Sequence, residues 1–196
     1  LYPSVLTNET RILKIARSLR AHAVFDEIVV VGRDAPGLPA HEDLGNGIHL
    51  YRLASAFGGR FESALGKVVR TLGWYFAVLW WMRSRSVECL NCHSLPVLPL
   101  SVLLKIWKRC KLVYDTHELE TETHVSRGLR KSLAKRVERA FIGRVDALCV
   151  VNRSIADLYK KSYSLERVWV VHNLPLRMTS LPKPTGLLRR AIGLES

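Results

Sequence analysis

The sequence predicts an α/β fold, a Rossmann-like, doubly wound and mainly parallel sheet with helices on both faces. Two observations carry this prediction: short, mainly apolar runs alternate with longer segments of helical spacing, and several of these runs end in polar residues. Strands of a parallel sheet are near-continuous apolar runs because helices cover both of their faces. Strands that alternate with helices are typical of βαβ units.

Each element follows from a local pattern. Apolar runs predict strands at residues 28–31, 87–92, 112–114, 147–151 and 168–171, and alternation predicts a strand near the sheet edge at 48–53. Helical spacing predicts helices at 11–19, 61–85, 95–110, 127–144 and 155–163. Asn8 or Thr10 is expected to cap the first helix and Ser154 the last. Residues 33–47 are rich in Pro and Gly and are expected to form a loop.

The charge of the chain bears on its partners. Its 196 residues suit one domain, or one domain and part of another, and contain 30 Lys and Arg against 17 Asp and Glu, a net charge of +13. Such a balance suggests nucleic acid, an anionic membrane surface or phosphorylated substrates as partners. The chain lacks the GxGxxG and Walker A patterns, which argues against a standard nicotinamide or P-loop role.

Polar side chains follow four of the predicted strands, and residues 111–118 are the most informative of these segments. The residues in question are His93; Asp115, His117 and Glu118; Asn152 and Ser154; and His172 and Asn173. The carboxyl ends of parallel strands share one edge of the sheet, where ligands bind in open α/β folds. The pattern therefore predicts a site at this edge. The alternative is that these residues only cap helices or solvate loops.

Neither the cysteines nor the acidic loop predicts a metal or haem. Cys89 to His93 match the haem c attachment pattern, but they fall on a predicted buried strand whose two thiols point to opposite faces. Free thiols are typical of a reducing cytoplasm. His117, Glu118, Glu120, Glu122 and His124 are metal-ligating residue types, yet their spacing fits no standard zinc pattern.

Two helical segments predict surface binding. Residues 71–82 are apolar on nearly every face, include three Trp, and are bracketed by Arg70 and Arg83. This run is too short to span a bilayer, so it is a core helix, an interfacial helix, or a helix with one side packed in the core and the other in contact with lipid. The helix at 127–144 has an apolar stripe of Leu129, Leu133, Val137 and Phe141, and Glu138 is its only acid among seven Lys and Arg. Its basic residues would attract anionic lipid.

Several segments, taken in order, resemble a known family. Residues 8–19 resemble its opening helix, 91–96 a strand end in which Asn91 replaces the usual acid, and 113–118 its "v-Y-D-x-H-E" segment. Residues 138–139, 145–147, 151–154 and 171–175 match further segments in the expected order. The chain thus resembles the N-terminal domain of a GT-B glycosyltransferase of the retaining family 4.

The resemblance implies an enzyme with two Rossmann-like domains facing a cleft. Residues 1–180 would be the acceptor-binding domain, and 181–196 the linker or the start of an absent domain that binds the nucleotide sugar. The chain would then be a fragment that is inactive alone. His117 is implied as the catalytic residue beside the donor sugar, with His93, Asp115, Glu118 and Asn173 binding substrate. No metal or other cofactor is expected.

The resemblance and the charge together predict the wider setting. We expect a hexosyltransferase of polysaccharide biosynthesis whose acceptor is lipid-linked or an envelope polysaccharide. The enzyme would lie in the cytoplasm, peripheral to the inner face of the cell membrane, and would contact anionic lipid and no nucleic acid. The alternatives are another GT-B-like enzyme, such as a sugar-nucleotide epimerase, or a basic module that binds nucleic acid or membrane.

Overall fold

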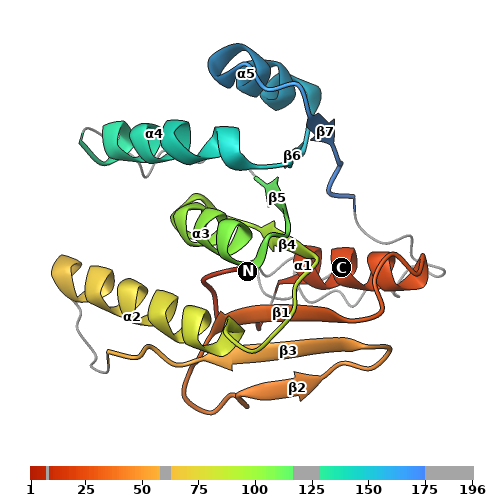
Figure 1. Ribbon diagram of the computed structural model, residues 1–196, viewed down its shortest axis with the longest axis vertical. Helices are drawn as coiled ribbons and strands as arrows, with labels where there is room; N and C mark the ends of the chain where they lie inside the picture. Colours follow the sequence, from red (N-terminus) through yellow and green to blue (C-terminus); the bar gives the residue numbers. More distant parts are fainter. Residues whose placement is uncertain (8, 58–62, 117–128, 175–196) are drawn as a thin grey trace, which may run out of the picture.

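Two sheets form the centre of the protein, whose computed structural model describes residues 1–7, 9–57, 63–116 and 129–174 (Figure 1). The first has the order β1-β3-β2, with β3 parallel to β1 and antiparallel to β2. The second is wholly parallel, in the order β4-β5-β6-β7. The strands are β1 (Ile28–Arg33), β2 (His41–Asp43), β3 (Ile48–Leu53), β4 (Cys89–Cys92), β5 (Lys111–Asp115), β6 (Ala147–Val150) and β7 (Val168–Val170).

The first residues of the chain join the two sheets. The Tyr2 amide donates to the Val31 carbonyl on β1 at 3.1 Å. The His93 amide, just after β4, donates to the Leu1 carbonyl at 3.3 Å. Residues 1–4 therefore act as an additional strand between β1 and β4, so that the carboxyl ends of both sheets share one edge.

Helices cover both faces of this sheet. They are α1 (Thr10–Ala21), α2 (Ala64–Met82), α3 (Leu98–Lys108), α4 (Leu129–Phe141) and α5 (Arg153–Tyr163). On β1, Val30 packs in a small core with Ile12 of α1, whereas Val31 packs in the main core with Trp74 of α2. Neighbouring strand residues point to opposite faces, so α1 and α2 lie on opposite sides. Figure 1 shows α1 on the right and α2, α3 and α4 one above another on the left.

The predicted fold class is confirmed, and most elements lie where the sequence predicts them. The helices expected at 95–110 and 127–144 each include a short 3-10 turn, η1 (Leu95–Val97) before α3 and η2 (Ile142–Arg144) after α4. The expected loop at 33–47 contains β2, which was missed. This strand reads His-Glu-Asp, which lacks the apolar alternation of a half-buried strand.

Two of the expected helix caps are wrong. Asn152 caps α5, since its Oδ1 accepts from the Ile155 amide at 2.9 Å, while Ser154 lies inside the helix. Thr10 is the first residue of α1 and follows Glu9, whose side chain makes no capping bond. The other candidate cap, Asn8, lies outside the described residues. Ser63 caps α2 by accepting from the Gly66 amide at 3.1 Å.

The Trp-rich helix α2 has one buried side and one exposed side. Trp74 and Val78 are fully buried, and the Trp74 indole donates to the Gly32 carbonyl at 3.0 Å. Trp80, six residues later, is 69% exposed. Within the described part of the chain, no helix is both long and apolar enough to cross a membrane. The sequence left core and interfacial positions open; α2 has one side in the core and one exposed side, and its contact with a membrane stays a prediction.

We expect Trp74→Phe to lower the free energy of unfolding by about 1–3 kcal/mol, because the buried Gly32 carbonyl loses its donor. The matched control is Trp80→Phe, which changes an exposed ring and should stay within about 0.5 kcal/mol of the wild type. Urea unfolding of the two variants measures both values. Equal losses would contradict the assignment of Trp74 to the core.

Candidate functional site

A buried ion pair lies at the carboxyl end of β5. Arg11, from the first turn of α1, places Nη2 2.6 Å from Oδ1 of Asp115, the last residue of β5. His93, just after β4, places Nδ1 3.3 Å from the other carboxylate oxygen, Oδ2. All three residues are less than a tenth exposed. Three segments far apart in the sequence thus meet at one carboxylate, at the edge where the fold predicts a site.

The electrostatics of this cluster keep Asp115 ionised. Burial by itself would raise the pKa of the carboxyl, but the hydrogen bonds and charges of His93 and Arg11 outweigh it and hold the pKa below its ordinary value. The carboxylate accepts from both neighbours, so it is committed to holding them in place. Its chemistry at neutral pH is that of a fixed anion.

The guanidinium of Arg11 has donor capacity left over. Its Nε and Nη1 are buried and have no hydrogen-bond partner within the described part of the chain. An unsatisfied buried donor costs about 1–3 kcal/mol. Asp115 accepts from Nη2 alone. The two nitrogens that lack a partner among the described residues mean that holding Arg11 at the sheet end lowers the stability of the fold.

Cys149 lies on β6 beside this cluster, paired with Asp115 across the two strands, and its thiol is protonated at neutral pH. Burial, followed by the negative charge of Asp115, raises the pKa of its thiol to about 11, against a smaller lowering by Arg11. A thiol is reactive only as the thiolate. Burial likewise raises the pKa of Cys89 and Cys110, and none of the four cysteines, all of which the structure describes, forms a disulfide.

The structure brings together some of the predicted site residues. His93 and Asp115 are in contact, and Thr116 follows them as a fully buried residue whose amide donates to the Cys149 carbonyl at 3.0 Å. His117 and Glu118 lie outside the described residues, so their roles stay predictions.

Asn173 is exposed, and its side chain contacts α1. Its Oδ1 accepts from Lys14 Nζ of α1 at 2.9 Å, and the same ammonium donates to the Leu174 carbonyl. Lys14 therefore attaches the segment after β7 to α1. The binding of substrate by Asn173 stays a prediction.

Sequence reasoning assigned no buried contact to Arg11 or Glu138. Glu138 is 1% exposed and accepts from the phenols of Tyr159 at 2.7 Å and Tyr163 at 2.6 Å, which ties α4 to α5. Burial and then the Glu138 charge raise the pKa of the Tyr159 phenol, which stays a neutral donor.

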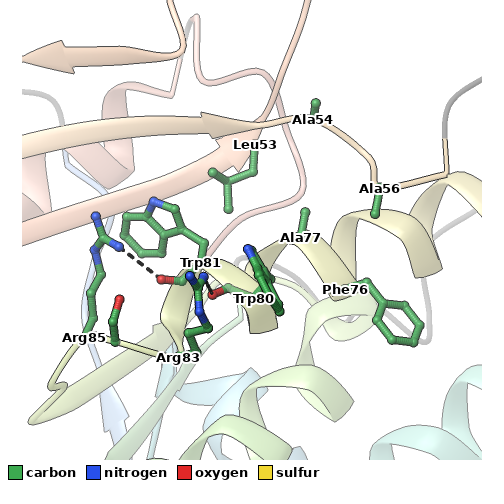
Figure 2. Close-up of a pocket in the computed structure, with 10 residues that line it drawn as sticks. Leu53, Ala54, Ala56, Phe76, Ala77, Trp80, Trp81, Arg83 and Arg85 are labelled. Carbon is green, nitrogen blue, oxygen red and sulfur yellow. Dashed lines mark hydrogen bonds between the residues drawn. The ribbon is translucent and has the colours of Figure 1, made fainter.

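A groove of about 700 Å³ lies elsewhere, between α2 and the residues after β3. Figure 2 shows Trp80, Trp81 and Ala77 of α2 facing Leu53 and Ala54, with Arg83 and Arg85 at one end. None of the predicted site residues lines this groove.

No group of three metal-ligating side chains that could hold an ion occurs in the described ranges. The segment from His117 to His124 lies outside those ranges, so the expectation of no metal stays a prediction. The residues described here supply hydrogen bonds and fixed charge at the sheet edge.

Acid should weaken the fold through Asp115. Because its pKa is lower in the folded chain than the ordinary 3.8, protonation favours the unfolded chain. The free energy of unfolding should therefore fall as the pH drops below about 5. Asp115→Asn should start about 3–5 kcal/mol less stable and lose part of this acid slope. Denaturation at stepped pH measures it, and exposed Asp157→Asn is the control. An unchanged slope in Asp115→Asn would contradict the stabilised carboxylate.

Comparison with known proteins gives a family and a fold. A family model described as Glycosyltransferase Family 4 matches residues 9–174. A shorter chain of sucrose-phosphate synthase from Thermosynechococcus elongatus superposes with a TM-score of 0.61 at 11% identity, covering 98% of this chain and 93% of that one. A longer chain of the same synthase gives 0.63 at 12% identity, covering 81% and 41%. No curated protein matches the sequence.

Proposed function

The chain belongs to glycosyltransferase family 4, and we propose that the whole protein transfers a hexose from a nucleotide sugar to an acceptor held by this domain. The observation that carries the proposal is the family match, which spans residues 9–174 and includes the buried cluster at the end of β5. The proposed reaction retains the configuration of the sugar. The fold is one half of a GT-B enzyme, similar to the synthase chains above.

The chemistry of such a transfer depends on positioning and on stabilising the leaving group. Asp115, held by Arg11 and His93, is proposed as a positioning residue that fixes the end of β5. The chain passes from there through buried Thr116 to residue 117. His117 is proposed to lie beside the donor sugar, where an imidazole can donate or accept a hydrogen bond near neutral pH. Glu118 and Asn173 are proposed to contact substrate.

The second half of the cleft is proposed to come from another domain. The chain covers 41% of the longer synthase chain, and residues 181–196 are proposed as the linker or the start of a nucleotide-sugar-binding domain. Residues 1–196 alone are therefore expected to transfer no sugar. We propose that no metal or cofactor is required.

The acceptor is proposed to be lipid-linked or an envelope polysaccharide, reached by a protein bound peripherally to the inner face of the cell membrane. The excess of basic residues supports this, since anionic lipid attracts each Lys or Arg near its surface by about 1 kcal/mol. A phosphate-bearing acceptor would be attracted by the same charge.

The test is an assay of the full-length protein against a panel of nucleotide sugars with membrane extract as acceptor. His117→Ala should lower kcat about 10²–10³-fold, the size of effect seen when one transition-state contact is removed. His22→Ala is the matched control, because His22 is an exposed histidine at the end of α1.

Unchanged turnover in His117→Ala would remove that residue from the site. Release of an epimerised nucleotide sugar without any acceptor would replace the transferase proposal with an epimerase. A full-length protein that is folded but consumes no nucleotide sugar would overturn the proposal as a whole.

A further inference from the structure

The net charge of the protein is concentrated in three helical spans. Residues 63–87, 95–111 and 129–145, which contain α2, α3 and α4, hold fourteen Lys and Arg and a single acid, the buried Glu138. The remainder of the chain has sixteen basic and sixteen acidic residues. The whole excess of +13 therefore belongs to these spans, whose helices lie one above another in Figure 1.

The outer side of α2 carries a continuous apolar stripe. Five large hydrophobic side chains at helical spacing are 48–73% exposed: Leu65, Val68, Leu72, Phe76 and Trp80. They lie on the side of the helix away from buried Trp74 and Val78. Lys67 and Arg70 flank the stripe and are exposed. We call these five residues the α2 ridge. A contiguous exposed apolar surface of this kind marks an interaction site.

Helix α3 carries exposed apolar side chains of its own. Its Lys108 Nζ donates to the carbonyls of Arg83 at 3.1 Å and Arg85 at 2.8 Å, which places the end of α3 beside the end of α2. Leu103, Ile106 and Trp107 of α3 are about half exposed. The two helices therefore present apolar side chains between basic ones, with no acidic residue in either span.

The groove at the end of the ridge combines aromatic rings with held guanidinium groups. The Arg83 guanidinium lies 4.0 Å from the Trp80 ring centroid, and that of Arg85 lies 3.7 Å from the Trp81 ring (Figure 2). Each also donates from Nη1 to the carbonyl of the same tryptophan at 3.0 Å. Two cations are thus held beside an exposed ring, Trp80, and a half-buried one, Trp81, where the cations can meet a phosphate while the Trp80 ring enters an apolar phase.

We propose that the outer face of α2 and α3 docks on an anionic lipid bilayer, with the α2 ridge inserted between the headgroups. Basic amphipathic helices with aromatic residues bind in this way, and tryptophan favours the interface. A second copy of this face would bring like charges together. A nucleic acid would use the cations and leave the ridge unburied.

This inference extends the proposed function, because a lipid-linked acceptor lies at the same surface. The two fail separately, because lipid binding is measured without any nucleotide sugar. A protein that binds vesicles but transfers no sugar would refute the transferase proposal alone.

The test is co-sedimentation of the full protein with phosphatidylcholine vesicles that contain or lack phosphatidylglycerol. We expect binding only to the anionic vesicles, weakened by salt.

Replacing Leu72, Phe76 and Trp80 by Ser should weaken binding at least about tenfold, since apolar burial is lost. Replacing Lys67 and Arg70 by Gln should cost about fivefold for each charge. Trp169→Ser and Leu158→Ser, which alter exposed residues of β7 and α5, should bind as the wild type does.

A second readout does not depend on the Ser variants folding. Lipids brominated in the acyl chain should quench tryptophan fluorescence in the wild type and less in Trp80→Phe, while Trp169→Phe keeps the wild-type quenching. The proposal is overturned if the protein binds neither kind of vesicle, if the ridge variant binds as tightly as the wild type, or if duplex DNA displaces the vesicles and is bound equally by the ridge variant.

Discussion

The buried ion pair between Arg11 and Asp115 is the contact on which the geometry of the sheet edge depends. It joins the first turn of α1, on one face, to the last residue of β5, and His93 brings in the end of β4. Desolvating two charges costs several kcal/mol, and the attraction within a pair that lacks some of its hydrogen bonds offsets only part of that free energy. Two nitrogens of Arg11 have no partner among the described residues, so stability alone gives no reason for this arrangement. Its effect is to fix where β5 ends.

The elements predicted from the sequence were those with a strong apolar pattern. β1, β5 and β6 are buried apolar runs, whereas β2 is a three-residue polar strand that exists only because β3 pairs with it. The stripe expected on α4 was partly wrong, because Leu133 is 62% exposed while Glu138 turns inward to two tyrosines. A buried charge is predictable only when its partners are known, and these lie on another helix.

The site, like the fold, was predicted in part from the sequence. Polar residues after parallel strands must share an edge, and His93 and Asp115 do meet there. Their partner Arg11 could not be inferred from spacing, since it comes from a helix 104 residues away and reads locally as a surface cation. The charged residues are also unevenly distributed. The spans that contain α2, α3 and α4 carry the whole positive excess, and α2 carries the ridge. The ion pair lies at the sheet edge that is proposed to be catalytic.

A double-mutant cycle on Arg11 and Asp115 tests the central claim most directly. The free energies of unfolding of Arg11→Met, Asp115→Asn and the double variant are compared with the wild type by urea denaturation. Each single change leaves a buried charge or dipole without its partner, so each should cost about 3–5 kcal/mol. The double variant should cost much less than the sum of the two, with a coupling of about 2–3 kcal/mol. Losses that add within about 0.5 kcal/mol would contradict the account, because Arg11 and Asp115 would then act independently.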